Sequence, residues 1–238
     1  MMKKKNCLPY CICVFCIVFI FQIQGCDSSK VDYYDGNRAL YFEREQFIVT
    51  ENGSGYVRLD TVNLNLSHYP GINEVRHPFK IRLIGNVLLE DTEYEMMKID
   101  SLSTAKEGMV SLPDRLLFKK GVVVDSLWVT VHKNKVETDG EYYVTYKLIE
   151  NENFTVGYTG YTMVKVWFNN LIKAPLWWDK EVEDIFLGEW SQEKFEILVQ
   201  VTGVFSFEGL SATEKRKYSL QLKEYIEENN LSMTVPVY

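Results

Sequence analysis

Between residues 39 and 168, apolar and polar side chains alternate with a period of two. Such alternation is typical of β-strands that bury one face. Leu127, Val129 and Val131 show it in one stretch of the chain, and Lys165 interrupts an apolar series in another. We expect strands at residues 39–42, 55–66, 78–84, 94–99, 116–118, 122–132, 141–149 and 161–168.

The segments between these strands are too short and too polar to be helices. A parallel strand pair needs a crossover of about a dozen residues, usually a helix. The pattern therefore predicts a mainly β protein whose residues 38–170 form an antiparallel, immunoglobulin-like β-sandwich.

The composition changes near residue 173, and a small α-helical region is expected at residues 171–238. Pro175 cannot continue a strand ladder, so it marks the boundary. Three helices are expected, at residues 180–187, 191–201 and 211–228, and each begins at a residue that can cap a helix: Asp179, Ser191 and Ser211. Alternation at residues 196–201 leaves a strand open as the alternative to the second helix.

The first 25 residues have the layout of a secretory signal peptide. Three lysines at positions 3–5 precede an apolar run at residues 7–21, and Gly25 stands just before Cys26. This segment resembles a bacterial lipoprotein signal, in which the cysteine becomes the first residue and carries fatty acyl chains such as palmitate. The resemblance implies an outer-membrane lipid anchor on Cys26, with residues 26–37 as its tether. It does not indicate which leaflet of the membrane holds the anchor. An uncleaved anchor is the alternative, although the run is short for a span of about 20 residues.

Cysteine content and charge limit the chemistry of the remaining chain. The other four of the five cysteines lie inside the signal segment, so no internal disulfide or thiol nucleophile is expected. The net charge of −7 argues against nucleic acid as a partner, because phosphates require an excess of Lys and Arg.

No catalytic residues, metal ligands or cofactor are predicted. His68, His77 and His132 lack the i, i+2 or i+4 spacing of zinc ligands and have no nucleophile motif nearby. The acidic residues at 181–184 could serve an envelope hydrolase as a pair of carboxylates, which is the enzymatic alternative. These residues are Glu181, Glu183 and Asp184.

Aromatic side chains are the best candidates for ligand contact. Trp177, Trp178 and Trp190 lie close together in the sequence and could stack on the apolar faces of sugars. The alternative is that they fill the seam between the sandwich and the helices, because an exposed tryptophan is costly unless a ligand covers it. Tyr158 and Tyr161 form a second aromatic patch on a loop.

Three short Asp-Ser/Thr-apolar motifs are possible sites of O-glycosylation. They centre on Thr61, Ser101 and Ser126. Thr61 and Ser126 fall in expected strands, so Ser101, beside an expected loop, is the best candidate.

Two resemblances to known families follow from further motifs. The loops and strands at residues 103–108, 117–121, 129–131 and 146–148 resemble the Calx-beta type of immunoglobulin-like sandwich. A Pro-x-Trp-Trp-Asp step, a Leu-Gly-x-x-Ser step and a Val-Thr-Gly step resemble a lipoprotein family of Bacteroidota, domain of unknown function 4843. They begin at Pro175, Leu187 and Val201. Residues 78–79, 104–108 and 150–154 also fit this family.

The second resemblance implies an accessory lipoprotein beside the paired outer-membrane transporter and lipoprotein that import glycans or peptides. It supplies no catalytic residues. We therefore expect a non-enzymatic envelope protein that binds a partner transporter, a glycan or a peptide. A structural, fimbrial-type surface protein is a further alternative, which would need a donor strand at one terminus.

Overall fold

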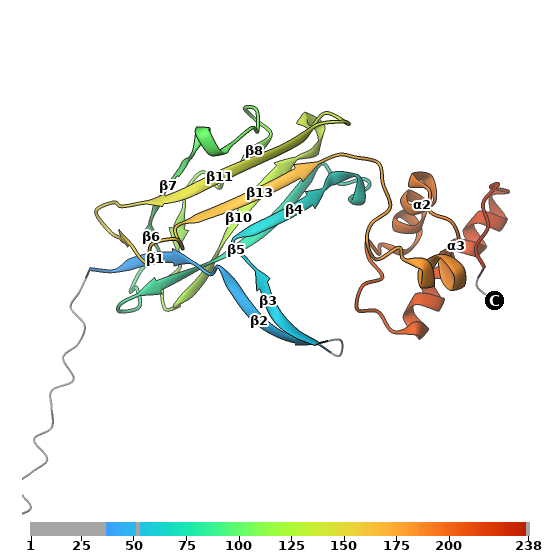
Figure 1. Cartoon of the computed structure of the whole chain (residues 1–238), viewed down its shortest axis with the longest axis horizontal. Helices are drawn as coiled ribbons and strands as arrows, with labels where there is room; N and C mark the ends of the chain where they lie inside the picture. The colour runs from blue at the N-terminus through green and yellow to red at the C-terminus, as the bar shows by residue number, and fades with distance from the viewer. Residues whose placement is uncertain (1–36, 51–52, 237–238) are drawn as a thin grey trace, which may run out of the picture. The chain divides into compact units, whose positions relative to one another are not determined.

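The computed structural model describes residues 37–50 and 53–236 (Figure 1). Cys26, the signal segment and most of the tether lie outside these residues. The described chain is mainly β, with four sheets followed by helices near the C-terminus.

The first large sheet has five strands in the order β12-β1-β5-β10-β8. Its centre is the long antiparallel pair β5–β10, in which Leu127 lies opposite Phe79 and Val131 opposite Val75. All four of these side chains are buried. The strands are β1 (Ala39–Phe42), β5 (Glu74–Ile84), β8 (Val110–Ser111), β10 (Val124–His132) and β12 (Thr155–Val156).

The second large sheet has four strands in the order β4-β13-β11-β7. In β13, Val164, Val166 and Phe168 are buried while Lys165 and Trp167 point away from the core. This confirms the period-two pattern. The strands are β4 (Thr61–Asn65), β7 (Glu95–Lys98), β11 (Glu141–Ile149) and β13 (Met163–Asn169).

The expectation of purely antiparallel pairing was wrong at one edge of each large sheet. β12 pairs with β1 in parallel, and β4 pairs with β13 in parallel. Parallel pairing needs a long connection, which a helix usually provides. Here the connection between β4 and β13 consists of residues 66–162, which contribute strands to both large sheets, so no crossover helix is required.

The two large sheets share one hydrophobic core. Phe42 and Phe79 of the first sheet and Val166 and Phe168 of the second belong to a single cluster of buried side chains, each at most 1% exposed. Burial of a side chain of this size contributes roughly 2 kcal/mol.

Two small sheets were not predicted as such. The expected strand at residues 55–66 is two strands, β3 (Gly53–Arg58) and β4, and β3 forms a hairpin with β2 (Glu45–Thr50). This hairpin extends away from the large sheets (Figure 1) and exposes Phe47 and Tyr56. The other small sheet pairs β6 (Thr92–Glu93) with β9 (Leu117–Phe118).

The C-terminal region contains the three expected helices. Asp179 accepts a hydrogen bond from Val182 N–H, and the chain then forms the π-helical turn η5 (Val182–Leu187). Ser191 caps α2 (Gln192–Thr202), which excludes the alternative strand at residues 196–201. Ser211 and Glu214 form the expected capping box of α3 (Ala212–Glu228).

These helices build a second hydrophobic cluster. Its buried members are Trp178, Val182, Phe186, Leu187, Phe195, Leu198, Val199, Phe207, Leu222, Ile226 and Val235. Contacts join this region to the second sheet: Gln192 Nε2 donates to Ser67 O at 3.2 Å, and the rings of His68 and Phe195 lie 6.4 Å apart. Both regions belong to one compact unit that begins at Asn37.

Candidate functional site

The outer face of the second large sheet carries an aromatic pair, an exposed Trp167 and a half-buried Tyr143. Trp167 of β13 lies opposite Tyr143 of β11, and their ring centroids are 4.6 Å apart. Trp167 is 38% exposed although tryptophan is a residue that proteins usually bury. Lys165 Nζ lies 4.2 Å from the Tyr143 ring and 4.4 Å from the Trp167 ring.

Amide side chains flank this pair because of the strand register. Asn63 of β4 lies opposite Trp167, and Asn65 lies opposite Asn169. On the other side of β13, Glu141 lies opposite Asn169. Residues on the same face repeat at about 6.6 Å along a strand, so aromatic and polar side chains form adjacent rows.

The linker after β13 and the loop after α2 turn this face into a groove of about 740 Å³. This volume is within the range of ligand pockets, about 300–1,000 Å³. Its aromatic lining comes from Tyr69, Trp167, Phe168, Trp177 and Phe205. Its polar lining includes Asn63, Asn65, His68, Glu141, Asn169, Lys173 and Glu208.

His68 connects the floor of the groove to the linker. Its Nε2 lies 2.9 Å from Lys173 O and 3.2 Å from Asn65 Nδ2, and the tautomer protonated at Nε2 donates to the Lys173 carbonyl. Burial lowers the pKa of His68 below its ordinary value, which favours the neutral ring. Asn65 Nδ2 and Ser67 Oγ both donate to Leu171 O, at 2.9 and 2.8 Å, and hold the same linker.

The three tryptophans of the C-terminal region differ in their placement. Trp178 is 5% exposed, and its Nε1 donates to Gly188 O at 3.0 Å. Trp177 is half-buried: it stacks on Phe207 with centroids 5.4 Å apart and also lines the groove. Trp190 packs against the helical cluster. Trp178 thus fills a core, and that core lies within the helical region, whereas Trp177 alone of the three lines the groove.

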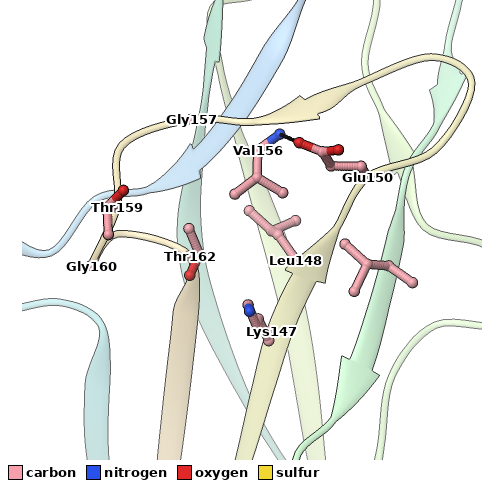
Figure 2. Close-up of a pocket in the computed structure, with 9 residues that line it drawn as sticks. Lys147, Leu148, Glu150, Val156, Gly157, Thr159, Gly160 and Thr162 are labelled. Atoms are coloured by element: carbon pink, nitrogen blue, oxygen red, sulfur yellow. Dashed lines mark hydrogen bonds between the residues drawn. The ribbon is translucent and has the colours of Figure 1, made fainter.

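Tyr158 and Tyr161 belong to a second aromatic group that also includes Tyr41 of β1. The Tyr41 ring lies 5.0 Å from Tyr158 and 6.4 Å from Tyr161. A shallow hollow of about 560 Å³ lies beside this loop, between the end of β11 and the start of β13. Figure 2 shows Lys147, Glu150 and Thr159 around it, with Val156 N–H donating to Glu150. Its lining includes none of the three tyrosines.

The sequence matches a family model, domain of unknown function 4843 (DUF4843), over residues 34–204. The chain belongs to this family. The match covers both large sheets and ends just after α2, whereas α3 lies beyond it. Comparison with curated proteins gave no match.

Solved structures resemble this DUF4843 chain only in part. A Bacteroides ovatus protein proposed to bind carbohydrate aligns with 57% of this chain and 38% of its own, at 9% identity and a TM-score of 0.38. A two-domain protein of unknown function from Bacteroides fragilis aligns with 57% of this chain and 46% of its own (14% identity, TM-score 0.34). A family 123 glycoside hydrolase from Clostridium perfringens aligns with 82% of this chain and 36% of its own (11% identity, TM-score 0.31). The DUF4843 chain thus spans less than half of each of these proteins, and no role is taken from them.

The carboxylates at residues 181–184 do not face one another across a groove. Asp184 pairs with Lys180 at 2.9 Å, and Glu181 pairs with Lys215 at 3.5 Å. All three acidic side chains are exposed, and none of them lines the groove or the hollow beside β11.

A serine, a histidine and a glutamate come together on the outer face of the first sheet, which sequence spacing did not indicate. Ser111 Oγ lies 2.9 Å from His132 Nε2, and His132 Nδ1 lies 3.4 Å from Glu74 Oε1. Strand register makes this contact, since Glu74 lies opposite His132 and Ser111 lies opposite Thr130. Ser111 and Glu74 are exposed, and neither lines the groove or the hollow beside β11.

Within residues 37–50 and 53–236, no group of three or more His, Cys, Asp or Glu side chains could hold a metal ion. In the same residues, no helix is long and apolar enough to span a bilayer.

The three O-glycosylation motifs differ in their accessibility. Ser101 is exposed in the short turn η3 (Asp100–Leu102), and Ser126 is exposed on β10. Thr61 is half-buried in β4 and donates to Asp60 Oδ1 at 3.2 Å. Modification of these residues stays a prediction, as does lipidation of Cys26.

Sequence reasoning did not select Trp167 or Tyr143. The signal was present, because the alternation around Lys165 places Trp167 on the same face as Lys165, opposite the buried Val164, Val166 and Phe168.

Proposed function

We propose that the protein is a non-enzymatic, lipid-anchored binding module of the cell envelope, and that the groove beside Trp167 holds a glycan chain. The observation that carries this proposal is the exposed Trp167 ring, which packs against the half-buried Tyr143 and lines the groove together with Asn63, Asn65 and Asn169. Flat rings pack against the apolar faces of pyranoses, and amides both donate to and accept from sugar hydroxyls.

The cellular context of the proposal comes from the sequence. The lipoprotein-like signal and the DUF4843 membership support an accessory role beside an outer-membrane transporter and lipoprotein pair. The two large sheets with a common core support an immunoglobulin-like sandwich as the domain that presents the groove.

A fimbrial-type role has less support. A C-terminal donor strand would have to be free, but Val235 is 8% exposed within the helical cluster. Thr234 O also accepts a hydrogen bond from Lys194 Nζ at 3.1 Å.

The proposal can be tested by measuring binding of the full chain, purified in detergent, to an array of polysaccharides. Trp167→Ala removes the proposed stacking surface and is expected to weaken binding at least tenfold, since a tryptophan ring buries a large apolar area. Trp128→Ala is the matched control. Trp128 is 41% exposed on the outer face of the first sheet, with the Arg76 guanidinium 5.0 Å from its ring.

Equal loss in both variants, or loss only with Trp128→Ala, would place the binding surface elsewhere and overturn the proposal.

A separate experiment tests the proposal that the protein is not an enzyme. A fluorophosphonate probe that labels the wild type but not Ser111→Ala would assign hydrolase chemistry to Ser111 and His132.

A further inference from the structure

A group of cationic side chains lies at the opposite end of β4 and β13 from the linker. Arg44, Arg58 and Lys165 line a pocket of about 350 Å³ together with Asp60 and Thr61. Three cations face one carboxylate here, in a chain whose net charge is −7. The local excess of positive charge is therefore opposite in sign to the protein as a whole.

Asp60 fixes the orientation of Arg58. Arg58 Nε donates to Asp60 Oδ1 at 2.8 Å, and Nη2 donates to Oδ2 at 2.7 Å. This fork uses two of the five guanidinium donors, so three remain for a ligand. Asp60 is 7% exposed, and the Arg58 side chain is 57% exposed, so the pair presents the arginine rather than the carboxylate to solvent.

Arg44 and Lys165 are less closely paired with carboxylates than Arg58 is. Arg44 Nε lies 3.8 Å from Asp60 Oδ2, and its guanidinium carbon lies 5.8 Å from the Tyr161 ring. Lys165 forms no ion pair with a carboxylate in the described part of the chain, and its Nζ instead contacts the Tyr143 and Trp167 rings. Glu45 lies opposite Arg58 in the hairpin but makes no ion pair with it among the described residues.

This pocket continues into the groove along two paired strands. Thr61 and Lys165 are paired at the pocket, and Asn65 and Asn169 are paired at the groove, four residues further along both strands. The distance is about 13 Å at 3.3 Å per residue. Lys165 connects the pocket to the groove. It lines the pocket, and its Nζ lies 4.4 Å from the ring of Trp167, which lines the groove.

We propose that the Arg44–Arg58–Lys165 pocket is an anion subsite, and that the glycan in the groove is an acidic polysaccharide that bears carboxylate or sulfate groups. The inference rests on the proposed function, because it assigns a ligand class to the same groove. Bidentate guanidinium contacts suit planar carboxylates and sulfates.

The test compares each acidic polysaccharide with a neutral form of the same backbone. Polygalacturonate is paired with its methyl ester, and chondroitin sulfate with desulfated, carboxyl-reduced chondroitin. The full chain is expected to bind at least one acidic polymer roughly tenfold more tightly than its neutral form. This preference should shrink between about 50 mM and about 500 mM salt.

Lys165→Gln and Arg44→Gln are the variants of choice, because both leave the buried Asp60 paired with Arg58. Each is expected to reduce the acidic preference severalfold, and Arg44→Gln, whose side chain does not line the groove, should also leave binding of the neutral form unchanged. Arg76→Gln, at the arginine beside Trp128, is the matched control and should keep the preference.

Equal binding of acidic and neutral forms would overturn the anion subsite while the proposed glycan function stands. Preference that survives in the Lys165→Gln, Arg44→Gln double variant would also overturn it. Absence of binding to any polysaccharide, acidic or neutral, would overturn the proposed function and the subsite together.

Discussion

At the scale of single residues, Lys194 is the side chain on which the C-terminal region depends most. It is 4% exposed, and its Nζ donates to Leu187 O, Glu189 O and Thr234 O at 3.1, 2.6 and 3.1 Å. These carbonyls belong to the π-helical turn, the following loop and the C-terminal segment. Burial lowers the pKa of Lys194, and the three acceptors compensate the buried ammonium.

Lys194→Met is therefore expected to lower the free energy of unfolding by about 2–4 kcal/mol, because three carbonyls lose their donor. Urea denaturation measures this change. Lys180→Met is the control, since Lys180 is exposed and its ion pair with Asp184 contributes less than about 1 kcal/mol. Equal stability of the Lys194→Met variant and the wild type would show that the three hydrogen bonds make no net contribution to the free energy of unfolding.

His68 predicts a pH dependence of stability. Burial lowers its pKa in the folded protein, whereas an unfolded histidine titrates near 6.5. As the pH falls below about 6.5, the unfolded chain binds a proton that the folded chain does not, so stability decreases. Burial also lowers the pKa of His77, so this histidine changes the stability in the same direction.

We expect the urea midpoint to decrease between pH 7 and pH 5, a range above the ordinary carboxylate pKa values. His68→Gln should reduce this slope, since glutamine can still donate to Lys173 O but does not titrate. A midpoint that rises on acidification, or an unchanged slope in the variant, would contradict the assignment.

At the scale of elements, two glycines end helices with a positive φ but differ in ψ, which is 7° at Gly203 and −172° at Gly188, and in their surroundings. Gly203 ends α2 with φ of 71°, and a Cβ there would meet no atom within 4 Å. Gly188 ends η5 with φ of 76°, and a Cβ there would lie 2.7 Å from Thr234 O.

Gly203→Ala is thus expected to cost about 1 kcal/mol, the conformational penalty alone. Gly188→Ala should cost more than that, because it adds a clash with a backbone oxygen that Lys194 also holds. Thermal unfolding of the two variants compares them directly. Equal costs would show that the C-terminal segment moves away freely from Gly188.

Elements were predictable where the deciding contacts are local. Ser191 accepts from Lys194 N–H and Ser211 from Glu214 N–H, so both caps depend on residues three apart, and both helix starts are confirmed. β4 and β13 pair in parallel although about a hundred residues separate them in the sequence. The alternation of apolar and polar side chains identifies each strand but does not indicate which strand it pairs with. The groove was missed for the same reason, because Asn63, Trp167 and Phe205 come together only in the folded chain.

At the scale of the whole molecule, the proposed lipid anchor on Cys26 would hold the groove at the cell envelope. We expect Cys26→Ser to abolish incorporation of labelled palmitate and to move the protein out of the membrane fraction. Ser101→Ala serves as the control and should leave both readouts unchanged. Palmitate labelling that persists in Cys26→Ser would contradict an anchor at that residue.

The central claim, that Trp167 contacts a glycan, can be tested most directly by NMR of the indole Nε1–H signals of the five tryptophans. The signals are assigned by single Trp→Phe variants and followed as an acidic polysaccharide is added. We predict that the Trp167 signal shifts with the added glycan while the Trp128 and Trp178 signals stay in place. A titration in which Trp128 shifts and Trp167 does not would contradict the account.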